Sequence, residues 1–174
     1  KDKGLTNLTH VTGDATVYPF DGKFHSMRAE RVFQHLKDAE IVALVERLGT
    51  IAEPNCVFSL VGIDWETVTC TIPAKHRDLF LTLKKFLIDN SNINFLHSAI
   101  AAFEANGFAT CDIALSTVKM DNFNVAMTAS NMGNIASQLA IDDERFQSMR
   151  RDFIDGKHYF AVSGSTAAFV YQGK

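Results

Sequence analysis

The sequence predicts a single α+β domain: an antiparallel sheet of about six or seven strands, built from three hairpins, with helices packed mainly on one face. Apolar residues with helical spacing are followed by a pair of strand-type runs, and this order occurs three times. Turn residues separate the two runs of each pair. With 174 residues, 47% of them hydrophobic, the chain can form one core. We expect an N-terminal arm over residues 1–26 and one domain over residues 27–174.

The first helix and the first hairpin follow the arm. Apolar residues at Ile41, Leu44 and Leu48 lie three and seven positions apart, which is typical of one buried helix face. Residues 57–62 and 65–72 are rich in β-branched and aromatic side chains, and a Gly-Ile-Asp sequence separates them. These two runs therefore predict a hairpin that turns at the glycine.

The same order is predicted twice more along the chain. Pro73 is placed to open a helix, and the apolar residues from Leu96 to Phe103 predict the next one. Alternating apolar residues then predict two further hairpins, separated by two helical segments. In chain order these elements are a hairpin of 111–118 with 123–129, helices over 131–140 and 142–154, and a hairpin of 158–163 with 166–171.

Charge and composition exclude several classes of function. The chain has 17 Lys and Arg residues against 20 Asp and Glu, so its net charge of −3 provides no general attraction for nucleic acid. No stretch approaches the roughly 18 uncharged apolar residues of a transmembrane helix. Glycine-rich phosphate-binding motifs and local metal-ligand spacings are absent, so we expect no cofactor and no metal ion. The compartment stays undetermined, with the cytoplasm as the default.

The three cysteines, Cys56, Cys70 and Cys111, are an odd number and too few for a disulfide framework. If residues 57–62 and 65–72 pair as a hairpin, Cys56 and Cys70 face each other within disulfide distance. Three reduced, largely buried thiols are the alternative, because cysteine is among the most buried residue types.

One pair of residues could carry covalent chemistry. Cys56 follows a Glu-Pro-Asn break, and His158 stands at the start of an apolar strand near the end of the sequence. A cysteine nucleophile needs an imidazole to lower its pKa and act as a base. A cysteine followed by a histidine on a later strand resembles the order in papain-like cysteine peptidases, and the resemblance implies a cysteine hydrolase that uses Cys56 and His158. A buried thiol and a strand-end histidine are the structural alternative.

The function that the sequence favours is a non-enzymatic binding or assembly protein that recognises another protein or itself. Phe20, Phe24, Phe80 and Phe95 fall outside the predicted inner faces, and clusters of exposed aromatic residues mark interfaces. The alternative for these residues is a pair of helices buried on two sides. The expected partner is therefore a protein or a second copy of this chain, and not a nucleic acid.

A carrier of a small apolar ligand is a further hypothesis. Its pocket would lie between the helices and the sheet, with Phe123, Met127 and Met149 among the lining residues. The same residue types fill ordinary cores, so the sequence leaves this choice open.

Overall fold

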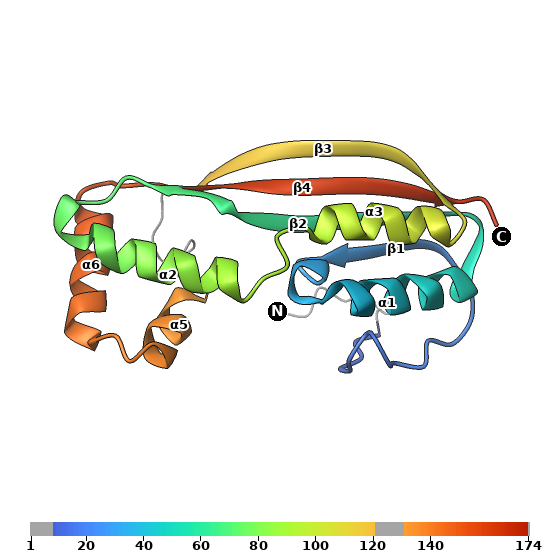
Figure 1. Cartoon of the computed structure of the whole chain (residues 1–174), viewed down its shortest axis with the longest axis horizontal. Helices are drawn as coiled ribbons and strands as arrows, with labels where there is room; N and C mark the ends of the chain where they lie inside the picture. Colours follow the sequence, from blue (N-terminus) through green and yellow to red (C-terminus); the bar gives the residue numbers. More distant parts are fainter. Residues whose placement is uncertain (1–8, 121–130, 174) are drawn as a thin grey trace.

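The structure is a computed structural model that describes residues 9–120 and 131–173. Its four strands form one sheet in the order β1-β2-β4-β3. β1 is parallel to β2, whereas β4 lies between β2 and β3 and is antiparallel to both (Figure 1). The strands are β1 (Phe24–Glu30), β2 (Ala52–Cys70), β3 (Phe108–Met120) and β4 (Phe160–Tyr171).

The predicted sheet of six or seven antiparallel strands is wrong, because two of the expected hairpins are single long strands. β2 runs for 19 residues through the sequence that was expected to turn, and β4 does the same for 12 residues. The glycine at the predicted β2 turn serves close packing instead. A β-carbon on Gly62 would overlap the ring of Phe95, while Gly164 pairs with Ile63 on β2 and Ser116 on β3. Glycine here marks a missing side chain in a strand and not a change of direction.

The middle hairpin is tested only in its first half. Residues 111–118 lie within β3, as expected for a strand. Residues 123–129, its expected partner, lie outside the described part of the chain. β3 pairs instead with β4, in a register that joins Phe108 to Tyr171 and Met120 to Phe160.

The helices lie where the prediction places them, but their buried faces are wider than predicted, since Phe80 and Phe95 are buried as well. α1 buries Ile41, Leu44 and Leu48 at 6% exposure or less, as their spacing predicts. At its start, the backbone N–H of Lys37 donates to the Glu40 carboxylate at 2.7 Å. The helices are α1 (Asp38–Ile51), α2 (Arg77–Asp89), α3 (Phe95–Ala105), α5 (Met132–Gln138) and α6 (Asp143–Asp155), with short 3-10 turns at Phe33–His35 and Ala74–His76.

The core consists of two clusters at opposite ends of the sheet. α1 and α3 pack at one end, and α2, α5 and α6 pack at the other (Figure 1). On β4, Phe169 and Ala167 belong to the first cluster, while Phe160 and Val162 belong to the second. Successive residues of a strand point to opposite faces, and β4 pairs with β3 without a register shift from Phe160 to Ala168. The helices therefore cover opposite faces at the two ends, which corrects the expectation of one covered face.

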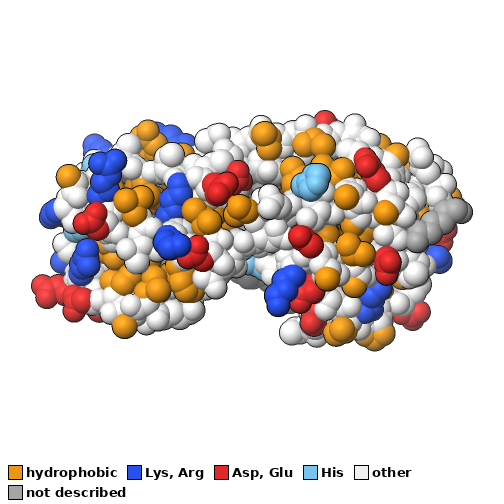
Figure 2. All heavy atoms as spheres, in the orientation of Figure 1, with side chains coloured by type: hydrophobic (Ala, Val, Ile, Leu, Met, Phe, Trp, Pro, Cys, Tyr) orange, Lys and Arg blue, Asp and Glu red, His pale blue; other side chains and the backbone are white. Residues whose placement is uncertain are grey.

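The surface reflects this division. Figure 2 shows the two ends as separate bulges with a hollow between them along one margin. The division into an arm over residues 1–26 and a domain over residues 27–174 stays a prediction, although β1 already begins at Phe24. Within the described residues, no helix has the length and apolar character needed to cross a membrane.

Candidate functional site

The loop that follows β1 is the first part of the candidate site. β1 ends at Glu30, and Arg31 then adopts a left-handed backbone conformation with φ at 58°. The N–H of Arg31 still donates to the carbonyl of Val61 at 2.7 Å, so the loop leaves the sheet directly beside β2. In open α/β sheets, ligands bind outside the carboxyl ends of the parallel strands. This loop lies at that end of the β1–β2 pair.

Gln34 holds the loop in place. Its side chain is 1% exposed, and its Oε1 accepts the backbone N–H of Ile63 on β2 at 2.7 Å. Its backbone carbonyl accepts the N–H of Asn92, from the segment between α2 and α3, also at 2.7 Å. The side chain and the backbone carbonyl of Gln34 therefore join the loop after β1 to β2 and to the α2–α3 connection, and the exposed His35 follows Gln34 in this loop.

A polar crevice of about 440 Å³ lies next to this loop, between the start of α1 and the α2–α3 connection. His35, Lys37 and Asp38 line its α1 side. Hydrogen bonds from Ser98 and then Asn92, each 2.8 Å from the Asp38 carboxylate, lower the pKa of Asp38 from its usual value. The crevice thus holds a fixed negative charge close to the carboxyl end of β1.

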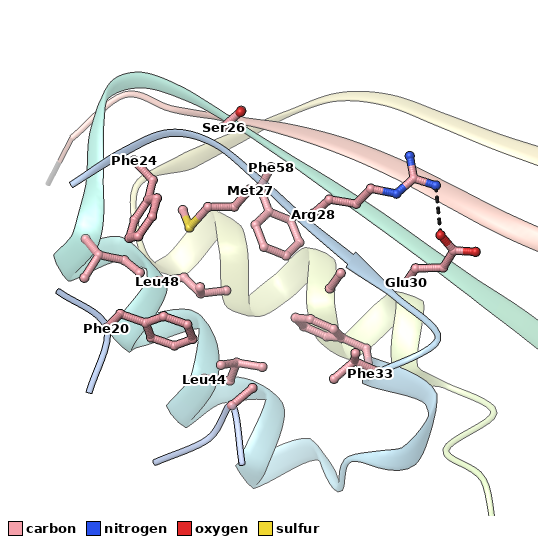
Figure 3. Close-up of a pocket in the computed structure, with 14 residues that line it drawn as sticks. Phe20, Phe24, Ser26, Met27, Arg28, Glu30, Phe33, Leu44, Leu48 and Phe58 are labelled. Atoms are coloured by element: carbon pink, nitrogen blue, oxygen red, sulfur yellow. Dashed lines mark hydrogen bonds and ion pairs between the residues drawn. The ribbon is translucent and has the colours of Figure 1, made fainter. Parts of the chain in front are cut away.

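A second, apolar cavity of about 380 Å³ lies between β1, α1 and the segment before β1. Figure 3 shows the side chains of Phe20, Phe24, Phe33 and Phe58 around this space, with Leu44 and Leu48 of α1. The side chains of Ser26, Arg28 and Glu30 lie on the other side of β1 in the same view. The cavity is of the size and apolar character that small ligands occupy.

The segment before β1 closes one side of this cavity and is held on α1 by two cationic side chains. Arg47 donates to the carbonyls of Thr16 and Tyr18, and Lys23 donates to the carbonyl of Thr50 at 2.6 Å. The Thr16 hydroxyl and N–H donate to Asp14, which lowers the pKa of that carboxyl group. These bonds define a strap over residues 14–24.

The structure separates the two residues of the expected hydrolase pair. Cys56 is completely buried beside α1 and α3, and burial raises the pKa of its thiol. His158 lies at the other end of β2, since Phe160 pairs with Cys70. Val57, next to Cys56, pairs with Val170, and Cys70 pairs with Phe160, so the two cysteines are about ten β4 residues apart, roughly 33 Å at the usual rise per residue. Cys56 and His158 therefore form no catalytic pair, and the facing arrangement of Cys56 and Cys70 is wrong.

A different cysteine lies near His158. Cys70 and His158 both line a cavity of about 490 Å³ at the start of α2. Burial raises the pKa of the Cys70 thiol to about 12, so this thiol stays protonated at neutral pH. All three cysteines, including the exposed Cys111, are free thiols.

The structure also places the predicted interface residues and the predicted ligand-binding residues in separate parts of the fold. Phe80 and Phe95 are core residues at 7% and 2% exposure, so they form no surface. Phe20 and Phe24 are half-buried and line the apolar cavity. Met149 is 1% exposed in the core beside α2 and α5, and Phe123 and Met127 lie outside the described residues.

A charged cluster at the other end of the molecule ties α2 to α6. The buried ring of His76 has its Nε2 2.8 Å from Asp152, and Lys75 contacts the same carboxylate at 2.5 Å. These partners, Lys75 first, lower the pKa of Asp152. Among the described residues, no group of three His, Cys, Asp or Glu side chains could hold a metal ion.

Sequence reasoning missed the loop after β1 and the role of Gln34. The segment around Gln34 is only a 3-10 turn, at Phe33–His35. No local signal marks a buried glutamine that bonds to a strand 29 positions away. The sequence reveals this contact only once β1 is known to pair with β2.

Comparison with known proteins gives a fold likeness. No protein-family model matches the chain, and no curated protein sequence matches it significantly. A putative methyltransferase from Bacillus halodurans is 16% identical with a TM-score of 0.54, and the match covers 95% of this chain and 78% of that chain. The YcgJ protein from Bacillus subtilis is 14% identical with a TM-score of 0.54, over 93% of this chain and 70% of that chain.

These likenesses assign the chain a methyltransferase-like, Rossmann-type fold with a mixed sheet. They overturn the prediction of a non-enzymatic binding or assembly protein, because the shared fold is that of a putative enzyme. The alternative of an apolar-ligand carrier is also non-enzymatic and is overturned on the same ground. The alternative of a cysteine hydrolase loses its catalytic pair, because Cys56 and His158 lie at opposite ends of β2.

Proposed function

We propose that this chain is part of an enzyme that transfers a methyl group from S-adenosylmethionine to a small-molecule substrate. The observation that carries the proposal is the strand order: β1 and β2 are parallel, and the antiparallel β4 lies between β2 and β3. The fold with this strand order is similar to that of a putative methyltransferase over 95% of the chain. Ligands of open α/β sheets bind at the carboxyl ends of the parallel strands. The loop after β1 and the polar crevice lie at that end.

Three side chains at this end are suited to act on the substrate. Glu30 ends β1, His35 is exposed on the loop next to Gln34 in the sequence, and Asp64 follows Ile63, to which Gln34 is bonded. A nitrogen or oxygen nucleophile loses a proton when it is methylated, and carboxylates and imidazole are the usual acceptors. The Asp38 carboxylate, held by Ser98 and Asn92, is suited to a cationic group of a substrate, and the neighbouring Lys37 is suited to an anionic one.

The described residues do not fit S-adenosylmethionine by themselves. The apolar cavity could take a planar base, but its lining includes only two charged side chains, Arg28 and Glu30, which pair with each other at 3.2 Å. The sequence also contains no Gly-x-Gly-x-x-Gly turn, the backbone feature that lets a Rossmann-type strand approach a nucleotide. We therefore assign no residue of this chain to the methionine or ribose part of the donor.

Photolabelling tests the proposal. A tagged copy of the chain, expressed in the cells that produce it, is irradiated in extract with methyl-labelled S-adenosylmethionine. The label should appear on the chain in peptides that contain the loop after β1, and excess S-adenosylhomocysteine should remove it while ATP should not. His35→Ala should keep the label and lower methyl transfer in the extract, whereas His158→Ala, at the far end of β2, should change neither. Absence of a competed label would contradict the proposed function.

A further inference from the structure

The apolar cavity between β1, α1 and the strap is larger than the voids of an ordinary protein core. Voids that exceed a water molecule are few in protein interiors, whereas this cavity has a volume of about 380 Å³. An apolar cavity of about 150 Å³ already holds a benzene molecule, and cavities that bind small molecules begin at about 300 Å³. The space therefore has the size of a small ligand.

The side chains around this space select an uncharged ligand. Figure 3 shows four aromatic rings and one thioether around the cavity, those of Phe20, Phe24, Phe33, Phe58 and Met27. The charged side chains of Arg28 and Glu30 lie on the other side of β1, where they pair with each other at 3.2 Å. Aromatic rings and thioethers both make favourable contacts with an aromatic ring. An aromatic hydrocarbon skeleton is therefore the group that this lining fits best.

The residues at the back of the cavity are almost closed to solvent. Phe33, Phe58 and Leu44 are 3% exposed or less, so the opening beside them is narrow. Phe20 and Phe24 of the strap are half-buried and line the same space. A polypeptide segment needs an open groove, whereas a small molecule enters a closed site when a loop moves. The access to the cavity thus favours a small molecule.

The packing of the strap favours such a movement. Hydrogen bonds from Arg47 and Lys23 to backbone carbonyls hold the strap on α1. Ala15, Phe20 and Phe24 also line a second hollow of about 570 Å³, which is formed by residues 9–24 alone. Segments with few packed contacts open at a low cost in free energy. The strap is therefore suited to open for a ligand and to close over it.

One end of the cavity meets the candidate site. Glu30, Val32 and Phe33 border the cavity, and they surround the start of the loop after β1. His35, which lines the polar crevice, is two positions beyond Phe33. A molecule whose apolar body fills the cavity therefore presents its other end near the carboxyl end of β1, where ligands of such sheets bind.

We propose that the apolar cavity holds the body of the substrate, an uncharged aromatic skeleton of about two fused rings, and that the strap closes over it. Its identity as the substrate rests on the proposed function, whereas the binding of an aromatic skeleton does not. The polar end of the substrate, which accepts the methyl group, lies outside the cavity at the loop after β1.

Two strap variants separate the cavity from the outer surface of the strap. Ala15→Phe adds a ring at a residue that lines the cavity, whereas Val17→Phe adds the same ring at a position that is 69% exposed and does not line it. Neither position is a buried core residue, so both variants should unfold at midpoints close to that of the wild type. The probe is N-phenyl-1-naphthylamine, whose fluorescence rises in apolar surroundings.

The full chain should bind this probe with 1:1 stoichiometry. In NMR spectra, the amide resonances of Met27 and Ala29 should shift on binding, while that of Leu83, in the other core cluster, should stay unchanged. Ala15→Phe should weaken probe binding at least about 10-fold, because its ring takes the space of the probe. Val17→Phe should leave the affinity unchanged.

Arg47→Met tests the strap. The substitution removes the hydrogen bonds that Arg47 donates to the carbonyls of Thr16 and Tyr18, and it keeps a long side chain. In stopped-flow measurements, the probe should dissociate at least about 5-fold faster from this variant, because the strap then opens more easily. An unchanged dissociation rate would refute the closing of the strap over the cavity.

Methyl transfer in extract tests whether the aromatic skeleton belongs to the substrate. With methyl-labelled S-adenosylmethionine, the labelled product that depends on the chain should partition into ethyl acetate, because its body is apolar. N-phenyl-1-naphthylamine should lower the amount of this product, and so should Ala15→Phe but not Val17→Phe. The photolabel on the chain should remain in both variants, since the cavity does not hold the methyl donor.

The other outcomes overturn separate parts of the proposal. Absence of probe binding, or equal binding by the wild type and Ala15→Phe, would refute the aromatic site, and a competed photolabel would still support the proposed function. An unchanged amount of product in Ala15→Phe, or a product that stays in water, would refute the substrate assignment and leave the proposed function in place. Probe binding in the cavity without a competed photolabel would contradict the proposed function, and the substrate assignment with it, but would retain the aromatic site.

Discussion

Gly62→Ala is the most direct test of the long strand β2. The added methyl group would overlap the ring of Phe95, which is 2% exposed within the core of α1 and α3 and has no open space to move into. Forcing extra atoms into a packed core costs about 1–3 kcal/mol. For a domain of this size, each kcal/mol lowers the unfolding midpoint by about 2–4 °C. Gly62→Ala should therefore lower the free energy of unfolding by about 1–3 kcal/mol in a urea titration followed by circular dichroism.

The paired strand offers a matched control. A β-carbon on Gly164 would meet the carbonyl of Gly62 at 3.5 Å and the Ser116 hydroxyl at 3.9 Å, which are ordinary contacts. Gly164→Ala should then be neutral, or stabilising by up to about 1 kcal/mol through the unfolded state. Phe95→Leu should relieve the overlap, so the double variant with Gly62→Ala should show a coupling of at least about 0.5 kcal/mol. Equal effects of the two glycine substitutions, with no coupling to Phe95, would refute the close contact.

Three further predictions follow from the hydrogen bonds and thiols described above. Gln34→Leu should lower the free energy of unfolding by about 1–3 kcal/mol in a urea titration, because the buried N–H of Ile63 loses its acceptor. Gln34→Glu keeps an acceptor oxygen and should lower it less. Equal losses of stability in the two variants would show that the hydrogen bond to Ile63 does not stabilise the fold. Iodoacetamide at pH 8, followed by peptide mass spectrometry, should modify the exposed Cys111 well before Cys70 and Cys56, and early labelling of Cys56 would contradict its burial. The pKa of Asp152 is lowered in the folded state, so its contribution to stability is present above about pH 4 and is lost as the pH falls through the folded pKa. Asp152→Asn should therefore make the thermal unfolding midpoint depend less on pH in the acid range. An unchanged pH dependence in this variant would refute the role of Asp152.

The parts of the fold that could be predicted are those encoded by local spacing. The spacing of Ile41, Leu44 and Leu48 predicts the buried face of α1, so this face can be located without knowledge of the rest of the chain. Strand pairing is encoded at long range, and a glycine has the same local signature in a turn and under an aromatic ring. Gly62 was therefore assigned to a turn, because Phe95, which requires it, is 33 positions away.

The candidate site was missed for a related reason. Its geometry depends on β1 being parallel to β2, which brings Arg31 beside Val61 and Gln34 beside Ile63. The short run from Phe24 to Glu30 alternates weakly, since four of its seven residues are exposed and the other three are only half-buried. Cys56 and His158 have reactive side chains, so the sequence draws attention to them as candidate catalytic residues. Gln34 has no such signal, although its buried amide shapes the site.

The central place of β4 has a consequence for the way the protein is made. β4 is the last strand in the sequence, yet it lies between β2 and β3 and forms both of their ladders. During synthesis, neither of those two long strands can pair with β4 until residues 160–171 have left the ribosome, so their inner edges stay open after β1 and all of the described helices have been made. A nascent chain in this condition is a natural client for a chaperone that shields unpaired strands. Truncation just before Phe160 should therefore give an aggregating product and not a smaller folded one.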